Sequence, residues 1–530
     1  MTAARADAER VIVVGAGIGG LVSALLLACR GLPVTLVEQA DRVGGKMRAL
    51  LVDGMAIDGG PTVFTMRWVF DQILDEAGSS TDALMRLQPL SVLARHAWRG
   101  QARSLDLHAD VRCSADEISA FASPQEAQRF LAFCQEARRI YQRLEGPHIR
   151  SSRPGFWQMV RDLGPRGLQE LTALGPFASL WRTLGRHFHD PRLRQLFARY
   201  ATYCGASPWQ APATLMLVAH VEMDGVWSID GGMDGLAQAL ADMAVQRGVQ
   251  LRLNSPVQTL LGSPQGVSGV RLRGGEELSA RRVVFNGDVN ALARGWLGTL
   301  AREAIGAPLQ PRQRSLSALT WAMHVRTQGF VPARHNVFFD ADYRSEFDDI
   351  FRQRRLPRQG TVYLCAQDRS DGRDALPAGP ERLLALVNAP ADGDRRTLSP
   401  TEIEACESRC LKLMQDCGLT LDISHPATQV RRRTPGDFNA LFPGSGGALY
   451  GPATHGWMAL FRRHGARTRL PGLYLAGGSV HPGPGVPMAA MSGRLAAATL
   501  MGDLASTQRS SRVHIAGGTW TPSARTAATR

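Results

Sequence analysis

The most informative stretch of the sequence is residues 11–38, VIVVGAGIGGLVSALLLACRGLPVTLVE. It opens with a β-branched run typical of a buried parallel strand. The glycine pattern Gly15-Ala-Gly17-Ile-Gly-Gly20 follows, then an apolar stretch expected to be a helix and a second strand over 34–37. Glycine allows a tight turn at the first position, close approach of a pyrophosphate at the second and close helix packing at the third. The stretch therefore predicts a nucleotide phosphate at the helix amino terminus.

An acidic residue closes the second strand. Glu38 comes 18 residues after Gly20, where a carboxylate accepts hydrogen bonds from a ribose diol and repels a 2′-phosphate. This spacing disfavours NADP and leaves FAD and NAD open. A membrane span over 11–29 is the alternative, but it explains only the hydrophobicity. Four central glycines and the strand that follows so soon argue against a span.

Two further glycine-containing stretches follow, Arg42-Val-Gly44-Gly45-Lys46 and Asp58-Gly-Gly60-Pro61-Thr62. Here the chain begins to resemble the flavoprotein superfamily of amine oxidases and carotenoid desaturases. In that superfamily the first stretch continues the adenine-nucleotide site and the second approaches the flavin ring. The resemblance implies that the cofactor is FAD. It also implies cofactor contacts at Arg42, Gly44, Gly45, Lys46 and Gly60.

A second strand, glycine loop and helix lie near the other end of the chain, from Leu470 onward. They resemble the carboxy-terminal motif of the bacterial-type phytoene desaturase family. The cofactor residues that this implies are Gly477, Gly478, Gly485, Val486, Pro487 and Met488. By the same analogy Val257 lies near the adenine. Gly478 departs from many flavoproteins, which have an acidic residue there.

The resemblance covers most of the chain and implies an α/β fold. We expect a Rossmann-like FAD-binding domain of the amine oxidase/carotenoid desaturase type with an inserted α+β substrate domain. The predicted flavin domain is discontinuous, over 8–105, 223–298 and 431–502, and the substrate domain covers 106–222 and 299–430. Residues 503–530 are predicted to be a disordered tail, because they contain little to bury.

Three stretches are most similar to the 1-hydroxycarotenoid 3,4-desaturases, which include hydroxyneurosporene and methoxyneurosporene desaturases. They are Thr434–Phe438, Gly447–Gly451 and Thr454–Trp457. The implied reaction introduces a C3–C4 double bond into a 1-hydroxy or 1-methoxy acyclic carotenoid, in carotenoid biosynthesis. Desaturation of phytoene or another carotene is one alternative, and an amine or porphyrinogen oxidase is another. The third alternative is a non-enzymatic escort protein that keeps the nucleotide fold.

The sequence does not identify a catalytic base. Asp342, Glu346, Glu222 and His335 lie in family-like stretches, but residues of these types more often make a structural hydrogen bond. His481 is expected to shape the flavin loop. A route in which hydride leaves first and water removes the proton needs no dedicated base. We predict no metal site, because the eight cysteines form no CxxC pair; their thiols are expected to be reduced.

The formal net charge is +14, and 59 of the 61 basic residues are arginine. These arginines are scattered, so we expect no nucleic-acid partner. A basic surface also suits anionic lipid. We expect a cytoplasmic protein peripheral to the inner membrane, because its implied substrate is dissolved there, with oxygen or a quinone as electron acceptor. Mixed aromatic and basic residues over 157–188 are a candidate entrance, although an ordinary helix pair fits them as well.

Overall fold

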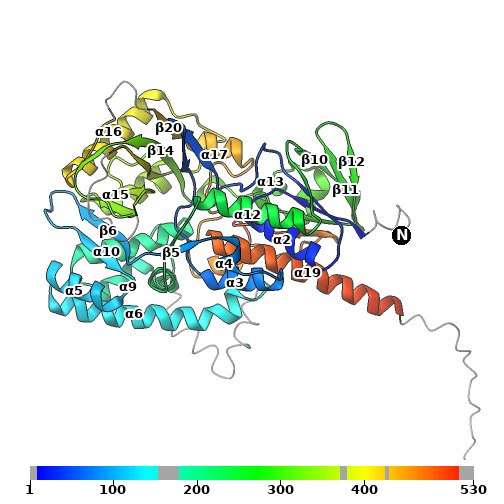
Figure 1. The fold of residues 1–530 in the computed structure, drawn as a ribbon, viewed down its shortest axis with the longest axis horizontal. Coiled ribbons are helices and arrows are strands. Elements are labelled where there is room, and N and C mark those ends of the chain that lie inside the picture. Colours follow the sequence, from blue (N-terminus) through cyan, green and yellow to red (C-terminus); the bar gives the residue numbers. More distant parts are fainter. Residues whose placement is uncertain (1–8, 153–160, 162–177, 370–378, 424–428, 513–530) are drawn as a thin grey trace, which may run out of the picture.

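The structure is a computed structural model that describes residues 9–152, 161, 178–369, 379–423 and 429–512. Two large sheets organise the chain. A five-stranded parallel sheet lies beside a mixed seven-stranded sheet, and helices cover both (Figure 1). The predicted α/β class with a parallel nucleotide-binding sheet is confirmed.

The parallel sheet collects strands from three distant parts of the chain. Its order is β21 (Leu473–Leu475), β13 (Arg282–Phe285), β1 (Val11–Val14), β2 (Val34–Val37) and β9 (Gln250–Arg252). The central strand β1 is buried on both faces: Val11 and Val13 pack into one hydrophobic cluster and Ile12 into another. This double burial explains why β1 is a continuous apolar run.

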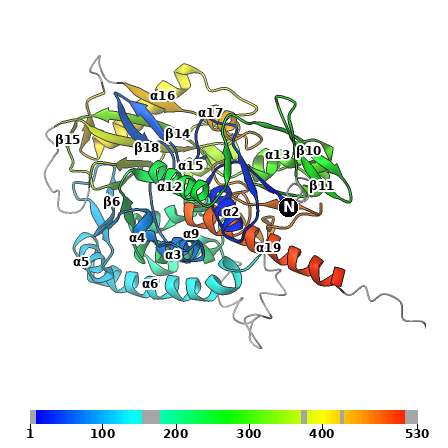
Figure 2. The same cartoon turned by 45° about the vertical axis from the view of Figure 1, so that its right-hand side comes forward.

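One face of this sheet is covered by helices α2 (Ile18–Cys29), α3 (Arg67–Glu76), α12 (Gly232–Gln246) and α19 (Val486–Arg512). The other face carries the antiparallel strands β10 (Val257–Ser263), β11 (Gly266–Leu272) and β12 (Glu277–Ser279), with helices α13 (Val289–Ala293) and α14 (Thr299–Ile305). In both views α19 begins inside the body of the protein and its carboxyl end projects from it (Figures 1 and 2).

The larger sheet has the order β20 (Val430–Arg433), β14 (Ser317–Val325), β18 (Glu381–Ala389), β17 (Val362–Ala366), β16 (His335–Phe339), β6 (Val92–Trp98) and β7 (Leu105–His108). Helix α16 (Pro400–Asp416) packs on one of its faces. A helical layer adjoins the β16–β6–β7 end, made of α5 (Val111–Phe121), α6 (Pro124–Leu144), α9 (Leu180–His187), α10 (Pro191–Ala198) and α11 (Leu217–Met223). Helix α6 forms the lower edge of the molecule in Figure 2.

Short elements connect these layers. The strand pairs are β3 (Ala49–Val52) with β4 (Met55–Asp58), β5 (Leu87–Pro89) with β8 (Trp227–Ile229), and β15 (Thr327–Gly329) with β19 (Leu419–Leu421). The remaining α-helices of the described segments are α4 (Thr81–Leu84), α15 (Tyr343–Asp348), α17 (Pro435–Leu441) and α18 (Ala459–Arg462). Single turns of other helix types are η1 (Glu145–Ile149), η2 (Arg199–Cys204), η3 (Ala213–Met216), η4 (Pro311–Gln313) and η5 (Asp349–Gln353).

The predicted domain division stays a prediction, but the sheet topology differs from it at two borders. Strand β6 falls in the segment 8–105 assigned to the flavin domain, yet it pairs with β16 of the larger sheet. Strand β20, placed at the start of 431–502, pairs with β14. Sheet membership depends on distant pairing partners, which local composition does not reveal.

The predicted tail also begins too early. Helix α19 continues to Arg512, because Asp503 is held by the Tyr474 hydroxyl at 2.9 Å and by an ion pair with Arg467. Residues 513–530 lie outside the described residues. Most of the candidate entrance 157–188 also lies outside them, and Phe188 at its end is buried in the helical layer. No helix in the described part of the chain is long and apolar enough to cross a membrane.

Candidate active site

The carboxyl ends of the parallel strands lie side by side. The Gly15 amide donates to the Val37 carbonyl at 2.8 Å, and the Asn286 amide donates to the Val14 carbonyl at 2.8 Å. The Ala476 amide reaches the adjoining strand in the same way, at 2.9 Å from the Phe285 oxygen. The loops after β1, β2, β13 and β21 therefore start at one edge of the sheet, where the connections from β1 diverge. Ligands bind at such a point in open α/β sheets.

The glycine loop after β1 has no space for side chains. Gly15 has a φ of +98°, which favours glycine. A Cβ on Gly20 would lie 2.0 Å from the Gly15 carbonyl oxygen, and one on Gly17 would lie 2.9 Å from Nδ2 of Asn286. Asn286 also donates from Nδ2 to the Gly15 oxygen at 3.1 Å. This asparagine was not predicted as a site residue, although it stands in a strand-turn motif.

The first helix fits a phosphate group. Gly17 precedes α2 and no side chain caps the helix, so its first amides are available to an anion. The Gly44 amide donates to the Ala16 carbonyl at 2.8 Å. A Cβ on Gly45 would lie 3.1 Å from the Cα of Gly17. The two glycine stretches thus meet without side chains, as a pyrophosphate site requires.

Glu38 lies beside this loop. Its Oε2 accepts from the Ala16 amide at 2.7 Å and its Oε1 accepts from the Ala40 amide at 2.9 Å. The predicted partner Arg42 points outward, with 51% of its side chain exposed, and contacts Asp41. Arg48, which donates from Nε to the Gly45 carbonyl at 2.8 Å, was not predicted. Burial lowers its pKa, and the charge of Glu38 acts against that lowering.

Val257 is the first residue of β10, and the segment that precedes β10 contacts Glu38. The Ser255 amide donates to the Glu38 carbonyl at 2.8 Å, and Val257 packs at the edge of the hydrophobic cluster that contains Val37. The predicted adenine-side residue therefore lies next to the predicted ribose-side residue.

The carboxy-terminal loop joins the same site. The Gly477 amide donates to the Ser492 hydroxyl at 2.6 Å, and a Cβ on Gly19 would lie 2.8 Å from the Gly477 nitrogen. Gly477 and Gly485 have φ angles of +109° and +105°. Val486 and Pro487 are buried at the start of α19, and Met488 packs against the cluster that contains α2. The glycine loops from the two ends of the chain thus lie side by side.

A buried charged cluster lies between the two loops. Lys46 donates to the Leu449 carbonyl at 2.5 Å. Burial lowers the pKa of Lys46, while Asp288 raises it. Burial raises the pKa of Asp288, against the charges of Lys46 and Arg463. Arg463 donates to the Gly478 carbonyl at 3.2 Å, which fixes that predicted loop residue. Arg463 was missed, because nothing in its neighbourhood marks it.

The Asp58–Thr62 loop connects the cofactor side to the larger sheet. A Cβ on Gly60 would lie 1.9 Å from the Lys46 carbonyl oxygen, so this loop packs on the first glycine stretch. Asp58 exchanges two backbone hydrogen bonds with the Gln367 side chain, at 2.9 and 3.0 Å. The Thr62 hydroxyl lies 2.6 Å from the Tyr363 hydroxyl, which lies 2.7 Å from Nδ1 of His335.

A second polar cluster is buried under the helical layer. Tyr200 and Tyr203 both donate to the Glu222 carboxylate, Tyr203 at 2.9 Å. Arg199 donates to the Tyr203 hydroxyl at 3.2 Å. Glu222 therefore has two neutral donors and a nearby positive charge. Its carboxylate is committed to these hydrogen bonds.

The other candidate bases also have structural partners. Glu346 accepts from the Thr361 amide and hydroxyl and from Asn388, and burial raises its pKa. Asp342 caps α15, accepting from the Ser345 amide at 3.2 Å. His481 places Nε2 at 2.9 Å from the Ser151 carbonyl.

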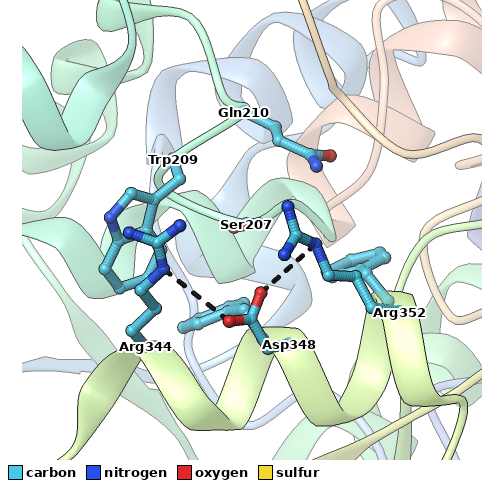
Figure 3. A pocket seen from close by; sticks show the side chains of 8 residues that line it. Ser207, Trp209, Gln210, Arg344, Asp348 and Arg352 are labelled. Carbon is cyan, nitrogen blue, oxygen red and sulfur yellow. Dashed lines mark ion pairs between the residues drawn. The ribbon is translucent and has the colours of Figure 1, made fainter.

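A small pocket of about 50 Å³ lies elsewhere, between η5 and the loop before η3. Figure 3 shows Arg344 and Arg352 on either side of Asp348, at 3.7 and 3.5 Å, with Trp209 beside them. Its volume holds about one or two water molecules. None of the predicted cofactor residues lines it, so it is not the site of the flavin chemistry.

The comparisons with known proteins identify the family. The model of the flavin-containing amine oxidoreductases matches residues 18–501. Hydroxyneurosporene desaturase of Rubrivivax gelatinosus is 64% identical over 98% of both chains. Hydroxyneurosporene desaturase of Cereibacter sphaeroides is 42% identical over 94% of this chain and 99% of its own.

A solved structure of putrescine oxidase bound to putrescine covers 94% of this chain and 99% of its own, with a TM-score of 0.58 and 18% identity, which shows the fold. The glycine loops, the uncapped amino terminus of α2 and the hydrogen-bonded Glu38 carboxylate beside them fit the flavin nucleotide that this family carries. The chain thus belongs to the flavin-containing amine oxidoreductase family, in its carotenoid desaturase branch, and is an FAD-dependent oxidoreductase.

Proposed function

We propose that this protein introduces the C3–C4 double bond into a 1-hydroxy or 1-methoxy acyclic carotenoid such as 1-hydroxyneurosporene. The observation that carries the proposal is the 64% identity to hydroxyneurosporene desaturase over nearly the whole of both chains. Identity of this extent includes the substrate half of the molecule as well as the nucleotide site.

The proposed cofactor contacts follow from the site. The amides at the start of α2, with Gly15, Gly17 and Gly20 around them, hold the pyrophosphate. Glu38 binds the adenosine ribose, and the loop that begins at Gly477 closes over the flavin end. The other proposed contacts are Gly44, Gly45, Lys46, Gly60, Val257, Gly478, Gly485, Val486, Pro487 and Met488. Arg42 is the weakest member of the set, because its side chain points outward.

When bound, FAD supplies the acceptor for a hydride removed from carbon. The protein must then orient the carotenoid and dispose of a proton. Glu222, Glu346 and Asp342 are all committed to hydrogen bonds within the fold. We therefore assign none of these three carboxylates as a catalytic base and favour removal of the proton by water. The roles of the protein are to bind, to align and to exclude bulk solvent.

We further propose peripheral attachment to the cytoplasmic face of the inner membrane, with oxygen or a membrane quinone as the final electron acceptor. A C40 carotenoid dissolves in lipid, and the net charge of +14 suits an anionic surface. Flotation with anionic vesicles tests attachment: recovery with the vesicles supports it, and recovery in the aqueous fraction contradicts it. Turnover in air, compared with turnover under argon with added quinone, identifies the acceptor.

Pigment analysis tests the reaction itself. The chain is co-expressed with a pathway that accumulates 1-hydroxyneurosporene and, separately, with one that accumulates phytoene. We expect a product two hydrogens lighter, with a red-shifted spectrum, from the hydroxylated substrate only. Conversion of phytoene alone would show a carotene desaturase instead, and inertness toward both would refute the proposal.

A further inference from the structure

Several buried polar atoms in the predicted substrate domain have no hydrogen-bond partner among the described residues, and two of them concern the site. They are Nε2 of His335 and Nε of Arg199, and neither has a partner among the described residues. His335 is 2% exposed and Arg199 is 8% exposed. A buried donor or acceptor left unpaired destabilises a protein, so such atoms usually bind something else, such as a ligand or a water molecule.

Both side chains are otherwise held firmly. His335 lies on β16 and uses Nδ1 for the Tyr363 hydroxyl at 2.7 Å. Arg199 donates from Nη2 to Tyr203, which donates in turn to Glu222. Each unpaired atom thus belongs to a side chain that is held in place by hydrogen bonds from another of its nitrogen atoms. Burial, and after it the positive charges of Arg334 and then Arg199, lower the pKa of His335 to about 3, so Arg199 acts on the imidazole alongside Arg334.

The His335 network leads directly to the cofactor side. Tyr363 contacts Thr62 at 2.6 Å, and Gln367, two residues further along β17, holds Asp58 of the same loop. This loop also packs on Lys46 through Gly60. An atom bound at His335 is therefore positioned relative to the glycine loops by rigid connections. Such connections are what a group that aligns a substrate requires.

The substrate class proposed above has one polar atom, the oxygen on C1. It is only three bonds from C3, so it must lie close to the reacting carbons. We propose that His335 and Arg199 form the polar end of the substrate site and bind this oxygen, thereby selecting 1-hydroxy and 1-methoxy carotenoids. The inference rests on the proposed function and adds the residues that determine its specificity.

The chemistry of the two groups suits both substrates. Arg199 always carries a proton on Nε and donates to a hydroxyl or to an ether oxygen. His335 is neutral, because burial holds its pKa low, and its Nε2 donates or accepts according to the tautomer. A hydroxyl group uses both partners, whereas a methoxyl oxygen only accepts. An unsubstituted carotenoid leaves both atoms unpaired, and such sites reject analogues that lack the polar group by about 10⁴-fold.

The test compares kcat/KM for 1-hydroxyneurosporene and neurosporene in the FAD-loaded enzyme and in His335→Leu. We expect the preference for the hydroxylated substrate to fall by about tenfold or more in the variant. The preference should fall because kcat/KM for the hydroxylated substrate decreases in the variant. His96→Leu is the matched control: His96 is equally buried, lies on the neighbouring strand β6 and pairs with the Leu105 carbonyl. Its preference should equal that of the wild type.

Arg199→Lys gives an independent measurement, because lysine keeps the charge and removes Nε. His335→Gln serves if the leucine variant does not load FAD. A preference unchanged in the Arg199 variant and in the His335 variant would overturn the inference and assign both atoms to buried water. Failure of the wild type to convert 1-hydroxyneurosporene would instead refute the proposed function, which separates the two outcomes.

Discussion

The contact between α2 and α19 joins the two ends of the chain, and one alanine tests it. A Cβ on Gly493 of α19 would lie 2.2 Å from the carbonyl oxygen of Gly19 in α2. Ordinary contact needs a separation larger by about 1 Å, and the obstacle is backbone that cannot rotate away. Ser23 reinforces the contact by donating to the Gly19 carbonyl at 2.8 Å and to the Gly493 carbonyl at 3.1 Å.

We predict that Gly493→Ala lowers the free energy of unfolding by about 2 kcal/mol. The clash costs up to about 3 kcal/mol, and the better helix propensity of alanine returns up to about 1 kcal/mol. Because Gly19 also contacts Gly477, separation of the helices should open the FAD site and weaken FAD binding by at least about tenfold. The control is Gly502→Ala in the same helix, where a Cβ would meet nothing within 4 Å; it should stabilise by about 0.5–1 kcal/mol.

Thermal unfolding followed by the fluorescence of released FAD, with equilibrium dialysis for affinity, measures both effects. The reasoning is refuted if Gly493→Ala is as stable as Gly502→Ala and binds FAD as the wild type does. That result would mean that α2 and α19 can move apart without loss of stability or of FAD affinity.

Two further predictions concern single carboxylates. Glu38→Gln should weaken FAD binding about tenfold or more, because the glutamine side chain cannot accept hydrogen bonds from both the Ala16 and the Ala40 amides. A fluorescence titration measures the affinity for FAD, with Asp41→Asn at an exposed position as the control. Equal affinities in the two variants would contradict the prediction. Burial raises the pKa of Asp394, but Arg314 and Arg294 outweigh it and bring the pKa to about 2. A depressed carboxyl pKa stabilises the fold fully above about pH 4 and progressively less as the pH falls toward 2. Asp394→Asn should therefore lower the free energy of unfolding by about 3 kcal/mol at neutral pH, since the charge of Arg314 is left buried and unpaired. The variant should also show a flatter acid-unfolding profile between pH 4 and 2. A profile parallel to that of the wild type would show that the ion pair contributes nothing.

The sequence predicted those parts of the site that depend on local pattern. The first strand, glycine loop, helix and second strand are consecutive, so their geometry follows from residue types in order, and Glu38 lies where its spacing placed it. The second glycine loop was predictable for the same reason. Arg42 was assigned to the cofactor by analogy, but its side chain points outward, whereas Arg48 donates to the Gly45 carbonyl of the glycine stretch. Arg42 and Arg48 lie close together in the sequence, and only the conformation of the loop determines which of the two side chains points toward the site.

The substrate side was not predictable in the same way. Arg199 and Glu222 lie on separate helical segments, and their link passes through the Tyr203 hydroxyl. The contact between Thr62 and Tyr363 joins residues 301 positions apart. Such pairs carry no periodicity or spacing that a single sequence displays. The pairing of β6 and β20 with strands of the larger sheet could not be predicted for the same reason, since only their partners reveal it.

An anaerobic single-turnover experiment shows whether the bound FAD itself oxidises 1-hydroxyneurosporene. The purified FAD-loaded enzyme is mixed with excess 1-hydroxyneurosporene without an electron acceptor, and the extracted pigments are quantified against bound FAD. We predict one molecule of product, two hydrogens lighter, for each FAD. No product, together with an FAD that stays oxidised, would contradict assignment of this chain as the 3,4-desaturase.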